Sequence, residues 1–165
     1  MENTGKRNKR NKCWRLFLNT GVVVVRSIKE YNRAEMKIKI LGTRANVEAS
    51  KPWHSKHSGM LVDGRLLFDL GEREFLDYDP QVLFFTHLHP DHAFFVREKE
   101  KINLEIPVYA PEESRYLDDI QVISEEVNWE GYSVTPIPVI HSLKVDSLAY
   151  LIEKDGKKVL YTATW

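Results

Sequence analysis

The sequence has little of what several protein classes require. A single cysteine, Cys13, among 165 residues excludes a disulfide framework and any cysteine-rich zinc module, and it is typical of a reducing compartment. Apolar runs are only a few residues long, so no segment has the composition of a transmembrane helix. An excess of one charge is also missing, because 24 basic residues balance 24 acidic ones. We therefore expect a cytoplasmic globular protein with no membrane partner.

Charge is distributed unevenly along the chain. Residues 1–35 hold nine lysines and arginines but three glutamates, whereas residues 36–165 hold 15 basic and 21 acidic residues. Such asymmetry is typical of a tail attached to a domain. An alternating strand pattern starts at Met36, and polar residues interrupt segment 16–25 too often for a secretory signal. We predict that 1–35 is a basic, poorly structured extension, with a nucleic-acid-binding arm as the alternative, and that 36–165 is one domain.

Short apolar runs alternate with turn signals from residue 36 onward. They predict strands at 36–41, 60–62, 66–70, 82–85, 108–110, 132–140, 148–152 and 158–161. Asp63-Gly64 and Asp155-Gly156 have the composition of two-residue turns, so each predicts a hairpin between the strands on either side.

Three further patterns complete the expected fold class. The continuous apolar run at 82–85 predicts a strand buried on both faces. Pro111, followed by two glutamates, predicts the start of a helix. Pro136 and Pro138 place the strand at 132–140 near a sheet edge or a bulge, because proline cannot donate a ladder hydrogen bond. The sum predicts a mixed α/β protein with two or three helices.

Four side chains that bind metal ions lie within six positions, directly after the strand at 82–85: His87, His89, Asp91 and His92. Neutral imidazole and carboxylate suit Zn²⁺, and also Fe²⁺ or Mn²⁺. Side chains two residues apart point the same way in an extended chain, so His87 and His89 can converge on one ion. Pro90 then breaks the extended run and displaces Asp91 and His92 toward a second position. Two ions about 3.5–4 Å apart could share a hydroxide there.

This loop resembles the signature H-x-H-x-D-H of the metallo-β-lactamase superfamily, and the resemblance extends over residues 36–161. Leu41-Gly42-Thr43 matches the end of the family's first strand, and residues 67–71 resemble its Asp-x-Gly element. The setting of His141 is most similar to the ribonuclease Z and cyclic-phosphodiesterase-like branch. The resemblance implies an αββα sandwich, an α+β architecture, of which this chain carries the N-terminal half and the following hairpin.

The resemblance also implies a role for each candidate ligand. His87, His89 and His141 would hold the first metal ion, whereas Asp91 and His92 would belong to the second site. Asp91 would also orient the attacking hydroxide, which makes it the candidate catalytic residue. The implied cofactor is Zn²⁺ at two sites, with Mn²⁺ or Fe²⁺ as alternatives.

Three residues outside the loop have two interpretations each. Asp69 resembles the acid that supports the metal loop in the family, and the alternative is an ordinary turn acid. His54 and His57 lie in a segment that would rim the site. We expect His54 to be a solvated loop residue, whereas His57 is either a second supporting residue or another loop histidine.

The sequence departs from the family pattern after its last predicted strand. That branch continues there with Gly-Asp, whose carboxylate bridges both metal ions, but this chain has Ala163 and Thr164. A neutral threonine cannot supply the negative charge of a bridging carboxylate. Deleting one base from codons for Thr-Gly-Asp-Met can produce Thr-Ala-Thr-Trp, the sequence of residues 162–165. We therefore hypothesise a frameshifted N-terminal portion of a longer hydrolase.

The resemblance predicts a metal-dependent hydrolase that acts on small-molecule or nucleotide phosphodiesters. Nucleic acid as substrate and a homodimer both stay open, although the acidic domain counts against a polyanion. One alternative is a non-catalytic or incomplete metal-binding fragment of such a hydrolase. The other is an iron-dependent dioxygenase of the same fold.

Overall fold

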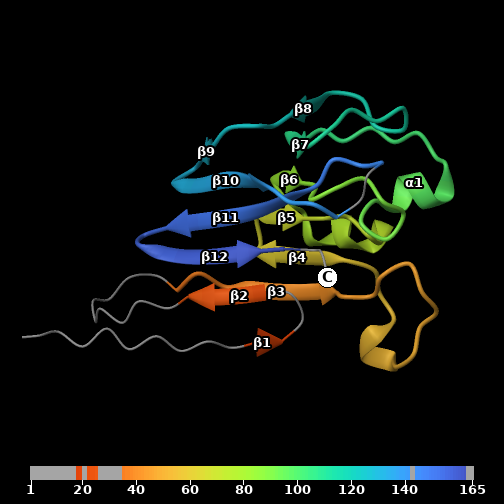
Figure 1. The fold of residues 1–165 in the computed structure, drawn as a ribbon, viewed down its shortest axis with the longest axis horizontal. Coiled ribbons are helices and arrows are strands. Elements are labelled where there is room, and N and C mark those ends of the chain that lie inside the picture. Colours follow the sequence, from red (N-terminus) through yellow and green to blue (C-terminus); the bar gives the residue numbers. More distant parts are fainter. Residues whose placement is uncertain (1–17, 20–21, 26–34, 142–143, 163–165) are drawn as a thin grey trace, which may run out of the picture.

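The computed structural model describes residues 18–19, 22–25, 35–141 and 144–162. The predictions for Ala163 and Thr164, and for most of residues 1–35, therefore fall outside the described residues. All twelve strands of the described residues belong to two six-stranded sheets (Figure 1).

The first sheet has the strand order β3-β4-β5-β6-β7-β8. Its strands are β3 (Ile38–Gly42), β4 (Gly59–Val62), β5 (Leu66–Phe68), β6 (Val82–Phe84), β7 (Val108–Ala110) and β8 (Ile120–Val122). The pairs from β3 to β5 are antiparallel, and those from β5 to β8 are parallel. The carboxyl ends of β5, β6 and β7 therefore meet at one edge of this sheet, which is where α/β proteins commonly bind ligands.

The second sheet has the order β1-β2-β12-β11-β10-β9 and is antiparallel throughout. Its strands are β1 (Leu18–Asn19), β2 (Val22–Val25), β9 (Val127–Trp129), β10 (Tyr132–Pro138), β11 (Leu148–Lys154) and β12 (Lys157–Tyr161). Strands β1 and β2 lie within residues 1–35, where the sequence analysis expected little structure. Four consecutive valines form β2, and β-branched residues favour an extended strand, which here pairs with β12.

The core lies on both faces of the first sheet. Alternate residues of β4–β6, among them Met60, Phe68 and Phe84, pack against Tyr132, Tyr150 and Tyr161 of the second sheet. The residues between them, such as Leu67 and Leu83, pack on the other face against Phe75, Phe94 and Phe95. The prediction that the strand after residue 82 is buried on both faces is therefore confirmed, and it explains why its sequence is apolar without alternation.

Both predicted hairpins are confirmed. Asp63-Gly64, followed by Arg65, joins β4 to β5, and Asp155-Gly156 joins β11 to β12. In the first turn, Arg65 N donates to Val62 O at 2.9 Å. All four turn residues have positive φ, between 50° and 73°. This is the left-handed conformation that a two-residue type I′ turn needs, and Asp-Gly tolerates it well.

The prediction of a helix at Pro111 is wrong. Residues after β7 form turns and isolated bridges, and Ile102 N donates to Tyr116 O while Ile102 bridges Leu117. Leu117 is buried in the apolar cluster on the outer face of the first sheet. Tertiary packing of this segment therefore overrides the local preference for a helix.

The described residues contain three helices, which agrees with the expected two or three, and all are short. They comprise one α-helix, α1 (Phe94–Glu98), and the 3₁₀ helices η1 (Pro52–His54) and η2 (Arg73–Tyr78). Figure 1 shows α1 to one side of the strands, following the loop that leaves β6. None of these helices is long and apolar enough to cross a membrane.

The two prolines of β10 lie where the sequence placed them. Residues 132–134 pair with β9 and residues 133–138 pair with β11, so residues 135–138 have β11 as their partner strand. Pro136 and Pro138 thus occupy the part of the strand beyond the reach of β9, where a missing N–H leaves no ladder bond unmade.

Candidate metal centre

The histidine-rich loop leaves the carboxyl end of β6 and is tied to both neighbouring layers. Thr86 O accepts a hydrogen bond from Leu148 N of β11 at 2.8 Å. The loop then turns, and His92 N and Ala93 N both donate to His89 O at 2.9 Å. The five-residue helix α1 follows at Phe94. The loop therefore lies at the sheet edge where the parallel strands end.

Three of the predicted ligands meet at one point. His87, His89 and His141 each offer one imidazole nitrogen, and these atoms all lie within 4.8 Å of one another. The ring centroids of His87 and His89 are 4.6 Å apart, and that of His141 lies 4.7 Å from His87. His87 is buried, His89 is half-buried and His141 is exposed. The cluster thus opens from the interior toward solvent.

His87 supplies the evidence that this cluster fits a metal ion. Its Nε2 atom is buried without a hydrogen-bond partner in the described structure, while Nδ1 lies 3.1 Å from Thr86 Oγ1. Burial, followed by the neighbouring histidines, lowers the pKa of His87 to about 2, so its ring is neutral at physiological pH. A buried unpaired nitrogen is costly, and a divalent cation would satisfy it. The donor set therefore fits Zn²⁺ or a similar ion.

Asp91 and His92 lie beside this cluster but contact each other. The ring of His92 is 4.0 Å from that of His87, and its Nε2 lies 3.3 Å from Asp91 Oδ2. Burial opposes protonation of His92, but Asp69 and Asp91 outweigh it and raise its pKa to about 9. Burial alone would raise the pKa of Asp91, but the contact with His92 lowers it to about 2.

Asp69 is fully buried and joins the two ends of the loop. Its Oδ1 accepts hydrogen bonds from Thr86 N at 2.8 Å and Thr86 Oγ1 at 2.9 Å. Its Oδ2 accepts from His92 Nδ1 at 2.9 Å and from Tyr161 OH at 3.0 Å. Four donors around one buried carboxylate favour the supporting role over that of a solvated turn acid.

Sequence reasoning did not identify Tyr161, whose hydroxyl contacts Asp69. Tyr161 belongs to β12 of the second sheet, and its buried hydroxyl reaches Asp69 across the core. Ser58 Oγ lies 3.5 Å from His92 Nε2. Alternation along β12 indicates that Tyr161 faces inward, but no local pattern could have identified its partner.

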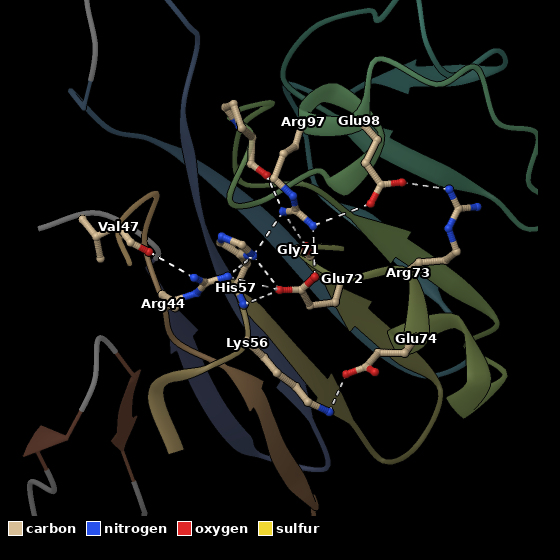
Figure 2. Close-up of polar contacts among 11 residues, drawn as sticks. Arg44, Val47, Lys56, His57, Gly71, Glu72, Arg73, Glu74, Arg97 and Glu98 are labelled. Carbon is tan, nitrogen blue, oxygen red and sulfur yellow. Dashed lines mark hydrogen bonds and ion pairs between the residues drawn. The ribbon is translucent and has the colours of Figure 1, made fainter. Parts of the chain in front are cut away.

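His57 and His54 take different positions. His57 Nδ1 lies 2.5 Å from Glu72 Oε1 and 3.1 Å from one guanidinium nitrogen each of Arg44 and Arg97 (Figure 2). These contacts of the His57 ring are therefore with a charged cluster rather than with the candidate ligands. His54 Nδ1 pairs with Ser50 Oγ at 3.0 Å in the neighbouring loop.

Comparisons with known proteins bear on the fold. No protein-family model and no curated protein sequence matches the chain. Among solved structures, it is similar to the metallo-β-lactamase fold protein YhfI from Bacillus subtilis, with a TM-score of 0.52 and 16% identity over 72% of this chain and 58% of that one. It is also similar to a diphosphatase of the PhnP family, with a TM-score of 0.51 and 16% identity over 72% of this chain and 62% of that one. The chain thus spans about three fifths of the length of each of these proteins. The likeness shows that this chain, with its two facing sheets and a histidine-rich loop at the strand ends, has the metallo-β-lactamase fold.

Proposed function

We propose that this chain carries the metal-binding half of a metallo-β-lactamase superfamily hydrolase that acts on phosphodiesters. The single observation that carries the proposal is the cluster of His87, His89 and His141 at the sheet edge, with a buried unpaired Nε2 on His87. One of the structural neighbours is a diphosphatase of the PhnP family, which supports a substrate with phosphoryl groups.

The three histidines would hold one divalent ion, with Zn²⁺ expected and Mn²⁺ or Fe²⁺ as alternatives. A bound ion of this kind lowers the pKa of its water to about 7 and polarises a phosphoryl oxygen. His87 stays neutral because of its low pKa and therefore needs no proton release to act as a ligand.

Asp91 would orient the attacking water rather than remove its proton. A carboxylate whose pKa is about 2 is ionised at neutral pH and accepts hydrogen bonds, but it is a weak base. Asp91 lies next to the histidine cluster and already contacts His92, so it can hold a water molecule beside both.

The substrate class is a small-molecule or nucleotide phosphodiester. Residues 36–165 carry 15 basic and 21 acidic residues, so the domain has no general attraction for a long polyanion. We therefore rank nucleic acid below small phosphodiesters, with RNA as an outcome of the assay.

The test is a Zn²⁺ titration by calorimetry followed by an assay with bis-p-nitrophenyl phosphate. We expect one tightly bound ion per chain and metal-dependent turnover, and absence of Zn²⁺ binding would overturn the proposal. A parallel Fe²⁺ sample with oxygen-uptake measurement identifies a dioxygenase instead.

A second candidate is a metal-binding fragment without catalysis of its own. It is favoured by the pairing of Asp91 with His92 and by the single three-ligand cluster among the described residues. Binding of one Zn²⁺ ion with no turnover of the phosphodiester would identify this candidate.

A further inference from the structure

Three backbone segments meet at the Asp91–His92 end of the histidine-rich loop, which spans residues 86–92 and is called the metal loop below. The segments are 57–58, 70–72 and the loop itself. Ser58 N donates to Asp91 O at 3.0 Å, and Leu70 N donates to His92 O at 2.8 Å. Gly71 N donates to Ser58 O at 2.9 Å and closes the group. A Cβ atom on Gly71 would lie 2.6 Å from the carbonyl oxygens of both Asp91 and Ser58, so the packing leaves no room for a side chain. The positions of Asp91 and His92 therefore depend on how these segments are held.

Arg97 of α1 donates hydrogen bonds to carbonyls of two of the three segments, and its Nη1 also lies 3.1 Å from His57 Nδ1 in the third. Its Nη1 donates to Gly71 O and to Pro90 O, both at 2.9 Å, and its Nη2 pairs with Glu72 Oε2 at 3.0 Å (Figure 2). Pro90 O belongs to the metal loop itself, one residue before Asp91. A planar guanidinium can serve several acceptors at fixed angles, which a lysine ammonium cannot.

Glu72 adds a second link between Arg97 and the third segment. Its Oε1 accepts from His57 N at 2.9 Å and lies 2.5 Å from His57 Nδ1. Burial would raise the pKa of Glu72, but the hydrogen bonds from His57 and the charge of Arg97 hold it below its ordinary value. Burial lowers the pKa of His57, outweighing Glu72. The Glu72 carboxylate thus links Arg97 to both the main chain and the ring of His57.

The nearby Arg73 shows what an ordinary surface arginine does. It pairs with Glu98 and Glu100, with about half of its side chain exposed (51%), and such pairs contribute little to stability. Arg97 is half as exposed (27%), and two of its acceptors are backbone carbonyls on different segments. The two arginines thus form a matched pair for comparison.

We propose that Arg97, held by Glu72, is a positioning residue that fixes the Asp91–His92 end of the metal loop. Its consequence for catalysis rests on the proposed function, but its effect on the loop does not. Ser58 N–H and Leu70 N–H report on this end because their acceptors are the carbonyls of Asp91 and His92. Leu148 N–H reports on the other end because its acceptor is Thr86 O.

The experiment measures hydrogen exchange of these three amides by NMR in the metal-free protein. In Arg97→Lys and in Glu72→Gln, we expect exchange at Ser58 and Leu70 to become roughly tenfold faster, as expected for loss of one or two hydrogen bonds. Exchange at Leu148 should change by less than about twofold, and Arg73→Lys should leave all three amides unchanged.

Two results would overturn the proposal. One is unchanged exchange at Ser58 and Leu70 in both variants. The other is an equal acceleration at Leu148, which indicates a general loss of stability rather than positioning. Zn²⁺ binding to the unchanged protein is measured separately, so failure to bind metal counts against the proposed function while the exchange result still decides the role of Arg97.

Discussion

The two ends of the metal loop, at His87 and at His92, both bury a histidine, but they differ in how the ring nitrogens are paired. His87 keeps a buried nitrogen unpaired and its pKa is low, whereas His92 has an acid on each side and its pKa is high. A metal ion at the first end would satisfy a group that the protein leaves unsatisfied. At the second end it would have to replace contacts that the protein already makes. The difference indicates that a metal ion would fit the first end as it stands, whereas the second end would have to rearrange to receive one.

The largest expected effect comes from removing the residue that joins both ends. Asp69→Ala leaves Thr86 N, Thr86 Oγ1 and Tyr161 OH without their acceptor and leaves His92 without its buried anion. We expect the free energy of unfolding to fall by about 3–5 kcal/mol, measured by urea denaturation. The exposed Asp77 is the control, and Asp77→Ala should change it by less than about 0.5 kcal/mol. Equal losses of unfolding free energy in the two variants would show that Asp69 does not join the two ends of the loop.

The first end is tested by His89→Ala. Loss of a residue that only hydrogen-bonds a metal ligand lowers metal affinity by up to about 100-fold. Loss of the ligand His89 itself should therefore lower Zn²⁺ affinity by more than about 100-fold, as measured by calorimetry. His54→Ala is the matched control, because His54 pairs with Ser50 in a loop away from the cluster. Similar affinities of the two variants would contradict the ligand role of His89.

The second end is tested by Asp91→Asn. The amide keeps the shape of the side chain but loses the charge that would orient the attacking water. In a form with activity, we expect kcat to fall by about 100-fold or more while Zn²⁺ affinity falls by at most about tenfold. Equal losses of kcat and Zn²⁺ affinity would show that Asp91 is itself a metal ligand, and the two ends of the loop would then not differ in this respect.

The smallest effect is expected from Tyr161→Phe, which removes one of four donors to Asp69. Tyr150→Phe is the matched control, because the Tyr150 hydroxyl donates to Phe85 O instead. Both changes should cost about 1 kcal/mol of unfolding free energy. Only Tyr161→Phe should also weaken Zn²⁺ binding, by roughly tenfold or less. An equal effect of both variants on Zn²⁺ binding would show that Tyr161 does not support the candidate metal site.

Sequence reasoning succeeded where the signal is local. The Asp-Gly turns need positive φ and the apolar run at 82–84 needs burial on both faces, and each requirement is visible in a few adjacent residues. His87 and His89 are close because they are two residues apart on an extended loop. His141 was placed with them by family resemblance alone, and it lies on a different segment beyond β10.

The contacts that sequence reasoning missed are all between distant segments. Arg97, Glu72 and Tyr161 carry no motif, and each acquires its role from a partner brought near by folding. The helix predicted at Pro111 failed for the same reason, because Leu117 is drawn into a cluster built from other strands. A local sequence pattern predicts a helix or a strand, but it does not predict which polar groups form hydrogen bonds between two elements.

The hydrogen bond from Tyr161 to Asp69 also has a consequence for protein synthesis. The two residues are 92 positions apart, and a ribosome adds about 5–20 residues per second. Asp69 therefore emerges roughly 5–20 seconds before Tyr161, and the histidine-rich loop emerges between the two. During that interval the nascent chain carries His87 and His89 but neither Tyr161 nor, for most of it, His141, so the cluster and its support are completed together only when β12 is translated.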